Sequence, residues 1–478
     1  MSEPVLSAQI GWWVIAGFSV IWIALGWFWG KRATSFDGHV LAGRNVGLAL
    51  ATATAMATWV TSNTTMAAPE VAYQFGIWGM VGYSLGACGL MLFAPMAERI
   101  KHLMPGGYTS GDFVRTRYGR VAWGTFMGVS FFYGLGWLVS MGMAGGVLLQ
   151  ALTGIPYRYG MLVITLVCVG YTLLGGLHAV IGTDFIQSVL ILIGLVIAGL
   201  VGLSQVPIAE VHQTLVEERP ALLDLLMPAS IMFLFNNLLF GLGEIFHSNV
   251  WWSRALAFRK GVGFRAFFVA GLAWLPVPVA AGCVALLAPA LGLNVPALDM
   301  VGPMVVARVM GSAGAVLILI VVFSSLASSL DSLLAATSDL IVEDVYRRLL
   351  RPEAGGPELK RAARLVILAL GALSIALCWT KTTTLARMIA FTGAFVASTI
   401  WPIVAGLYWK NANARAATLG MALGTAAGLT AYFTLGWYTA ALVGASVSMI
   451  CVVVGRGLWP TPFDWTKLAE LRAPEDAA

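Results

Sequence analysis

Residues 324–339, SSLASSLDSLLAATSD, place many hydroxyl groups inside a long apolar stretch. Four serines share one helical face by i, i+3, i+4, i+7 spacing: Ser325, Ser328, Ser329 and Ser332. Hydroxyl and carbonyl oxygens are the ligands that a small hard cation accepts in place of water. Small residues at this spacing also suit close helix packing, with serines bonded to their own helix. Because four hydroxyls lie beside Asp331, we favour a cation site.

Two carboxylates lie in apolar stretches. Asp331 flanks the serine stripe, and Asp184 lies in IGTDFIQSV. A carboxylate at the centre of a membrane helix costs roughly 2.5–3.5 kcal/mol on insertion scales and is by default a functional candidate. We therefore expect Asp331 to face a cavity or a partner. Asp184 is either a functional group of this kind or an interfacial residue exposed to water.

Two further segments carry polar groups at mid-length. Segment 46–74 is interrupted by Thr58, Thr61, Ser62, Asn63, Thr64 and Thr65. Segment 225–253 has polar residues around the sequence GLGE: Asn236, Asn237, Glu244, His247 and Asn249. We expect the second segment to unwind at GLGE. Glu244 and His247, spaced i, i+3, can pair with each other, sense protons or contact a solute, and a purely structural interhelical pair is the alternative.

The elements that carry these residues are membrane helices. The mean hydropathy is +0.85, only 10% of residues are charged, and apolar runs long enough to span a bilayer recur from end to end. Runs of this length indicate helices and exclude a soluble protein and an outer-membrane barrel. We count 13 spans. The five cysteines lack metal-ligand spacing, and we find no Walker loop, H-E-x-x-H or G-x-S-x-G elbow, so an ATP-driven pump or an enzyme is not expected.

The basic residues indicate the topology. With the N-terminus outside, the loops and tail on the inner side hold 23 of the 28 lysines and arginines, including Arg254 and its neighbours. This positive-inside bias predicts an N-terminus outside and a C-terminus in the cytoplasm of a bacterial-type inner membrane. The formal charge of +6 is then explained by the basic residues of the cytoplasmic face. The expected partner is the lipid bilayer, and no nucleic acid is expected.

The order of the spans predicts an internal repeat. A block of five spans whose first span begins inside is followed by a block of five whose first span begins outside. Two halves of opposite topology are the pattern of an inverted repeat in secondary transporters. We therefore divide the chain into an extra N-terminal helix and loop (1–45), a first repeat (46–205), an outer loop (206–224), a second repeat (225–410) and two C-terminal helices with a cytoplasmic tail (411–478). The first helix of each repeat is interrupted, which points to a binding site at the membrane midplane.

Several stretches along nearly the whole chain together resemble the sodium:solute symporter family. They are MPGGYTSGDFVRTRYG, GGLHAVIGTDFIQ, SSLASSLDSLLAATSDLIVEDVY and GLYWKNANARAATLGMALG. The resemblance implies an all-α, five-plus-five inverted-repeat fold, often with 13 helices, and Na⁺ as the coupling ion. It places a sodium site at the carbonyls of Ala57, Val60 and Ser325 and at the hydroxyls of Ser328 and Ser329. Ser324–Ser325 is the competing hydroxyl pair, and counting back from EDVY selects Ser328–Ser329.

Some members of the family carry a second sodium ion. The resemblance places its counterparts here at Asp184, Ser328, Asp331 and Ser332. The family more often has a neutral residue at the position of Asp331. This departure implies a tighter second cation site, a proton-binding group or an altered exit path.

The same resemblance implies where the solute binds. By position in the fold, the candidate contacts are Thr61, Thr64, Tyr133, Asn237, Glu244 and Thr392. AYQFG and WWSRALA look like the urea-transporter branch, although that branch usually lacks the aspartate found here at 184.

We therefore expect a sodium-coupled importer of a small polar organic solute, such as urea, an amino acid or a carboxylate. We expect it to act as a monomer or a loose homo-oligomer. A proton-coupled symporter of the same fold and a membrane sensor that binds solute and signals to a partner are the alternatives.

Overall fold

The computed structural model describes residues 4–30 and 36–471. Within these ranges the secondary structure is helical, and its only β-type pairing is an isolated bridge between Val46 and Phe258. The helices of the N-terminal part are α1 (Ala8–Gly30), α2 (Phe36–Leu41), η1 (Ala42–Arg44), α3 (Leu48–Trp59), α4 (Ser62–Phe75), α5 (Ile77–Ser84), α6 (Ala87–Leu103), α7 (Ser110–Tyr118), α8 (Arg120–Thr153) and α9 (Tyr157–Gln205).

The rest of the described chain is helical too. Its elements are α10 (Ile208–Glu218), η2 (Pro220–Leu222), α11 (Pro228–His247), α12 (Asn249–Ala257), α13 (Gly263–Trp274), α14 (Pro276–Ala285), η3 (Leu298–Met300), α15 (Val301–Ile341), η4 (Val342–Leu350), α16 (Gly356–Cys378), α17 (Leu385–Ala397), α18 (Ile400–Tyr408), α19 (Ala414–Thr434), η5 (Trp437–Thr439), α20 (Ala440–Leu458) and α21 (Thr466–Ala469).

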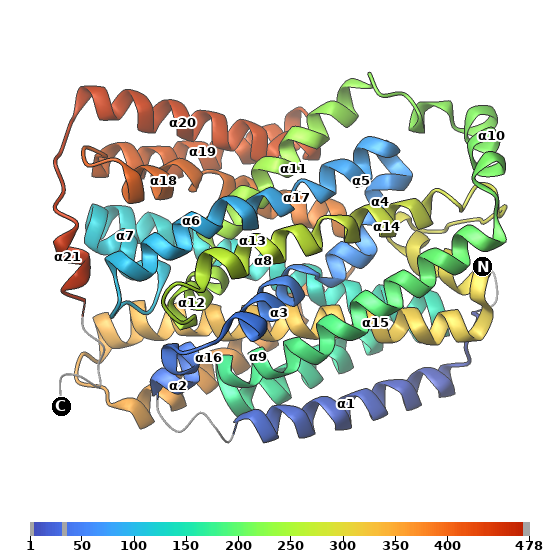
Figure 1. Cartoon of the computed structure of the whole chain (residues 1–478), viewed down its shortest axis with the longest axis horizontal. Coiled ribbons are helices and arrows are strands. Elements are labelled where there is room, and N and C mark those ends of the chain that lie inside the picture. Colours follow the sequence, from blue (N-terminus) through green and yellow to red (C-terminus); the bar gives the residue numbers. More distant parts are fainter. Residues whose placement is uncertain (1–3, 31–35, 472–478) are drawn as a thin grey trace.

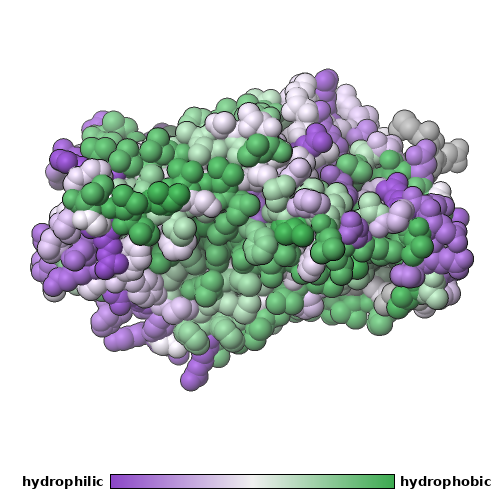
Figure 2. Space-filling view, turned by 90° about the horizontal axis from the view of Figure 1, so that it is seen from above, coloured by the Kyte–Doolittle hydropathy of each residue, from purple (hydrophilic) through white to green (hydrophobic). Residues whose placement is uncertain are grey.

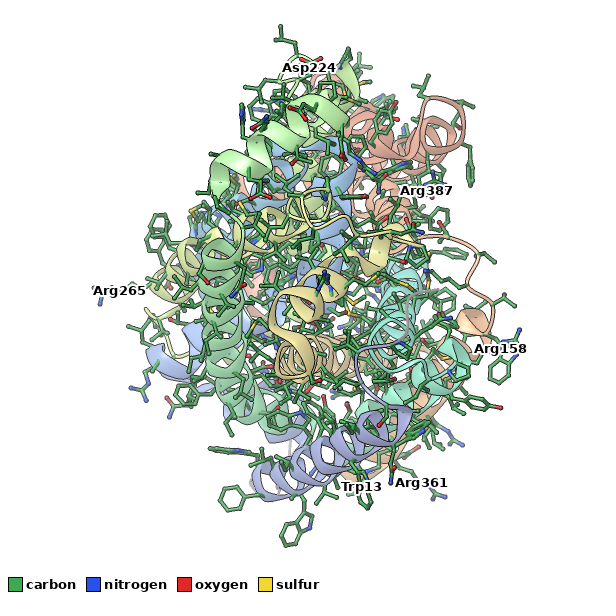
Figure 3. The ribbon with its side chains drawn as sticks, turned by 90° about the vertical axis from the view of Figure 1, so that its right-hand side faces the viewer. Trp13, Arg158, Asp224, Arg265, Arg361 and Arg387 are labelled. Carbon is green, nitrogen blue, oxygen red and sulfur yellow. The ribbon has the colours of Figure 1, made fainter. Side chains whose placement is uncertain are left out.

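The helices run along the long axis of the molecule (Figure 1). We call the end that carries α7, with Arg115 and Arg117, and α21, with Lys467, the basic end, and the end that carries α10 the far end. Figure 2 shows a largely hydrophobic band between two hydrophilic ends. α1 lies at the edge of the bundle, and Trp13 on it is 71% exposed and points away from the other helices (Figure 3). This surface is that of a protein embedded in lipid.

The described residues contain eleven helices that are long and apolar enough to cross a membrane. Two shorter apolar helices, Leu48–Trp59 and Tyr157–Leu173, accompany them. The membrane-embedded, all-helical class is therefore confirmed, while the count of 13 spans and the division into repeats stay predictions. One difference concerns the expected spans 159–177 and 181–204, which the structure joins in the single helix α9.

The first helix of the expected first repeat is interrupted as predicted. α3 ends at Trp59, Val60 has the non-helical angles φ −80° and ψ 79°, and α4 begins at Ser62. Thr61 caps α4 in a capping box with Thr64. The polar run therefore provides the cap that starts a second helix in the middle of the segment.

The first helix of the expected second repeat breaks one turn later than predicted. α11 continues through GLGE to His247, and the break falls at Ser248, whose ψ is 130°. Both glycines of GLGE serve packing instead. A Cβ on Gly241 would lie 2.6 Å from the Cα of Gly86, and one on Gly243 would lie 2.8 Å from the Cα of Ala397. These glycines let neighbouring helices approach closely, which is their common use in membrane proteins.

Candidate functional site

The break between α3 and α4 exposes backbone oxygens at the centre of the bundle. In an unbroken helix the amide of Thr61 would donate to the carbonyl of Ala57. Here it donates to the side-chain oxygen of Thr64, at 3.2 Å. Ala57 and Val60 are both fully buried. The carbonyl of Ala57 is thereby released from its helical partner and can serve another ligand.

The serine stripe of α15 faces this break. Ser329 Oγ lies 3.2 Å from the carbonyl oxygen of Thr58 and 2.9 Å from that of Ser325. Ser325 Oγ lies 3.3 Å from Thr65 Oγ1 on α4. The structure therefore brings Ser325 and Ser329 to the interrupted helix, which is the arrangement that a cation site shared by the two elements requires.

Ser328 points toward Asp184 on α9. Its hydroxyl donates a short hydrogen bond to Asp184 Oδ1. Thr54 Oγ1 donates to Asp184 Oδ2 at 2.6 Å, and Ser332 Oγ donates to the carbonyl of Ser328 at 2.7 Å. Asp184 is fully buried, which excludes the alternative of an interfacial residue exposed to water. Ser328, Ser332 and Asp184 thus lie together in one buried polar cluster.

A cation already lies in this cluster. Arg254 on α12 is fully buried, and its Nη2 lies 3.2 Å from Asp184 Oδ2, 2.8 Å from Ser332 Oγ and 2.6 Å from Thr58 Oγ1. Its Nε donates to Thr54 Oγ1 at 3.1 Å, and its Nη1 donates to the carbonyl of Val250 at 3.1 Å. The guanidinium group therefore contacts two of the four residues predicted to hold a second cation, Asp184 and Ser332.

Sequence reasoning missed this role of Arg254. We had counted Arg254 among the basic residues of the inner loops, but it lies inside helix α12 with none of its side chain exposed. The signal was present, because a buried carboxylate such as Asp184 requires a compensating charge. An arginine within the apolar sequence WWSRALAF was the available partner.

Asp331 lies beside the cluster. Its Oδ1 accepts from the amide of Ser332, at 2.5 Å, and its Oδ2 has no hydrogen-bond partner among the described residues. Asp184 and Arg254 are close enough to interact with it electrostatically. The side chain is fully buried, as expected for a group that faces the protein interior.

A central cavity adjoins the helix break. It has a volume of about 10 Å³, which is the room that one water molecule needs. It is lined by Trp59, Thr61, Thr64, Tyr83, Gly86, Trp137, Asn237, Phe240 and Trp274. Three of the predicted solute contacts, Thr61, Thr64 and Asn237, therefore lie in its wall. The wall is aromatic and hydroxylic, and none of its residues carries a charge.

Two more cavities of about 10 Å³ lie along α11, the helix that contributes Asn237 and Phe240 to the central cavity. The far-end cavity shares Tyr83, Asn237 and Phe240 with the central one. The basic-end cavity is lined by Ser130, Tyr133, His247, Ser248, Asn249, Val250, Ala336, Thr337 and Leu340. Phe233, Asn237, Phe240, Glu244 and His247 follow one another on α11 at steps of three or four residues. One face of α11 therefore passes all three cavities.

Glu244 lies on α11 between Phe240 of the central cavity and His247 of the basic-end cavity. Its Oε1 accepts from Tyr133 Oη at 2.5 Å, and its Oε2 accepts from Trp251 Nε1 at 2.9 Å. The ring of Trp251 contacts that of Trp59, with centroids 5.6 Å apart. Glu244 thus joins the wall of one cavity to that of the next. We name Glu244, Tyr133 and Trp251 the bridge.

The remaining sequence-derived expectations have mixed outcomes. His247 contacts Ser130 Oγ through Nε2, at 3.1 Å, so Glu244 and His247 have different partners rather than each other. Thr392 on α17 donates to the carbonyl of its own Ile389, at 2.7 Å, and lines none of the three cavities. Gly136 on α8 is the close neighbour of its methyl group.

Ion pairs and a charged hydrogen bond link neighbouring helices at both ends of the row of cavities along α11. At the basic end, Arg348 pairs with Asp112 and with Asp344, linking η4 to α7. At the far end, Lys381 pairs with Asp299 at 2.7 Å. Glu70 on α4 accepts from the amide of Ala386 in the first turn of α17, at 3.0 Å. The three small cavities therefore lie between two ends at which charged residues link neighbouring helices.

The sequence was compared with known proteins. The urea-proton symporter DUR3 of Oryza sativa subsp. japonica is 27% identical, over 98% of this chain and 74% of its own length. The high-affinity proline transporter PutP of Bacillus subtilis is 24% identical, over 84% of this chain and 88% of its own. These relatives are transporters and not enzymes.

A solved structure has the same fold. It is a substrate-bound, outward-open Na⁺-coupled sialic acid symporter, with a TM-score of 0.79 at 19% identity, and the match covers 95% of this chain and 99% of that one. The model of the family described as "SSF: Sodium:solute symporter family" matches residues 39–424. The chain therefore belongs to the sodium:solute symporter family.

Proposed function

We propose that this transporter couples sodium to the import of a small neutral polar solute by alternating access. The observation that supports it most directly is the meeting of the α3–α4 break with the hydroxyls of α15. We assign the sodium to the carbonyls of Ala57, Val60 and Ser325 and the hydroxyls of Ser328 and Ser329. These are hard oxygen ligands, and the diverted Thr61 amide leaves the Ala57 carbonyl available to an ion.

Sodium at this position would couple to the solute through the helix break. The ion would hold α3 and α4 against α15, while Thr61 and Thr64 at the start of α4 line the central cavity. Coupling requires that both ligands favour the same conformation, because an ion that bound all conformations equally would shift none of them. Loss of sodium to the cytoplasm would release α15 from the break and favour solute release.

We assign one sodium ion per cycle, because the charge of Arg254 already contacts Asp184 and Ser332, two of the residues predicted for the second cation. Proton coupling through the same fold is the second candidate, favoured by the relative named a urea-proton symporter. We place the basic end in the cytoplasm, with the N-terminus outside and the C-terminus inside, as the distribution of lysine and arginine predicts. The oligomeric state that we expect is a monomer or a loose homo-oligomer in the plasma membrane.

The central cavity favours a solute of the urea type. Its wall offers hydroxyl, amide and aromatic groups without a charged partner for an amino acid or a sugar acid. A buried charge without a partner is strongly unfavourable, so a zwitterion would bind poorly there. A cavity of about 10 Å³ must expand to hold any solute, and a solute of few atoms requires the smallest expansion.

Uptake into proteoliposomes tests this function. We expect accumulation of ¹⁴C-urea driven by an inward sodium gradient at fixed pH, with competition by acetamide but not by proline or sialate. Uptake driven equally well by a proton gradient without sodium would contradict sodium coupling and support the second candidate. Competition by proline at the same concentration as acetamide would contradict a neutral solute.

A further inference from the structure

The basic-end cavity contains a hydrogen-bonding atom that the structure leaves without a partner. His247 is 1% exposed, and its Nδ1 is buried with no hydrogen-bond partner among the described residues. The other ring nitrogen, Nε2, contacts Ser130 Oγ. A buried polar atom of this kind calls for a ligand or a water molecule.

The neighbours of His247 determine which hydrogen-bonding character Nδ1 has. Ser130 Oγ lies 2.8 Å from the carbonyl of Phe126 and donates its one proton there. It must then accept from Nε2–H of the histidine. The rings of Phe126 and Tyr133 surround the imidazole, with centroids 4.5 and 5.5 Å away, and these surroundings favour its neutral form. In a neutral imidazole protonated on Nε2, Nδ1 is a hydrogen-bond acceptor.

We propose that the basic-end cavity is a second, release-side solute site, in which His247 Nδ1 accepts a hydrogen bond from an N–H group of the solute. The inference rests on the proposed function, because it takes the same urea-type solute. The site follows the central cavity along the face of α11. The bridge lies between the two sites, so the solute passes when Tyr133 and Trp251 separate at Glu244.

Such a site lowers the barrier to release. A solute that leaves the central cavity loses its hydrogen bonds before it reaches water. An acceptor about two to three helical turns further along α11 replaces one of them during this step. Removing the acceptor is therefore expected to slow release without changing how the solute binds from outside.

Two substitutions of the same residue separate acceptor chemistry from packing. In His247→Gln the side-chain amide takes the place of Nε2, so the contact with Ser130 is kept and the acceptor at Nδ1 is lost. In His247→Asn the amide takes the place of Nδ1, so an acceptor is kept and the Ser130 contact is lost. Thr337→Val changes a residue of α15 that lines the same cavity and is a second variant of the site. Asn237→Leu is the comparison variant in the central cavity.

The experiment measures initial rates of ¹⁴C-urea uptake into proteoliposomes at saturating sodium. We expect His247→Gln to lower kcat about tenfold, the effect of one hydrogen bond, with KM unchanged. Thr337→Val should act in the same direction, His247→Asn should keep most of the wild-type kcat, and Asn237→Leu should instead raise KM.

Three results would overturn the proposal: a wild-type kcat in His247→Gln, a rise in KM like that of Asn237→Leu, or an equal loss in His247→Gln and His247→Asn. Wild-type protein that transports no urea would overturn the proposed function itself, and the release site with it. The two failures are therefore distinguishable.

Discussion

Ser329→Ala is expected to raise the sodium concentration for half-maximal uptake roughly tenfold or more, the scale seen when a metal site loses a supporting group. The Ser329 hydroxyl is the group of α15 that reaches the carbonyl of Thr58 at the helix break. Alanine removes this oxygen but keeps the helix and its packing. Maximal uptake at saturating sodium should change little. Uptake of ¹⁴C-urea over a sodium titration, at constant ionic strength, measures the effect.

Ser324→Ala provides the matched control. Ser324 lies on the same helix and is equally buried, but its hydroxyl has no hydrogen-bond partner among the described residues. The substitution is chemically identical, so general effects of a serine-to-alanine change in α15 appear in both variants. We expect wild-type sodium dependence in Ser324→Ala. The reverse pattern would assign the site to the pair Ser324–Ser325 and contradict the register used here.

Arg254→Met is expected to have the largest effect on stability. The substitution keeps an unbranched apolar side chain but leaves Asp184 buried without its counter-charge. Breaking a buried ion pair in this way costs about 3–5 kcal/mol. We expect a clearly lower unfolding temperature in detergent. An unchanged unfolding temperature would contradict the buried pair.

Two further comparisons isolate the charge. The double variant Asp184→Asn with Arg254→Met removes both charges, and it should recover much of the lost stability, as a coupled pair does in a double-mutant cycle. Sodium chloride, compared with choline chloride, should stabilise Arg254→Met more than the wild-type protein, because the freed Asp184 can then take a sodium ion. Equal stabilisation of both proteins would contradict the assignment of Arg254 to the second cation position.

Local patterns predicted the parts of the site that depend on one helix. The serine stripe follows from helical spacing alone, and the break at Val60 follows from a polar run that includes the cap Thr61. Hydropathy predicted a helical membrane protein, and the quoted sequence stretches predicted its family. These properties depend on residues that are near one another in the sequence, so they can be read without the fold.

The parts that sequence reasoning missed depend on contacts between distant segments. The sequence GLGE could mark a helix break or a close approach between two helices. The structure shows close approach, because the backbone of Gly86 lies beside Gly241 and that of Ala397 lies beside Gly243. Arg254 and Asp184 are 70 residues apart in sequence, and their pairing requires α12 to lie beside α9. The hydroxyl of Thr392 could have faced a cavity, but it bonds to its own helix.

In the proposed cycle, the guanidinium of Arg254 would also limit how far the transporter can concentrate its solute. A covalently attached cation is not released into the cell, so it carries no charge down the membrane potential. With one mobile sodium ion, a potential of 100 mV provides about 2.3 kcal/mol, and a tenfold sodium gradient adds about 1.4 kcal/mol. Together they support a gradient of a neutral solute of roughly 500-fold. A second mobile ion would square that ratio, so a cycle with one sodium ion and Arg254 would reach a shallower solute gradient but would use only one charge per solute.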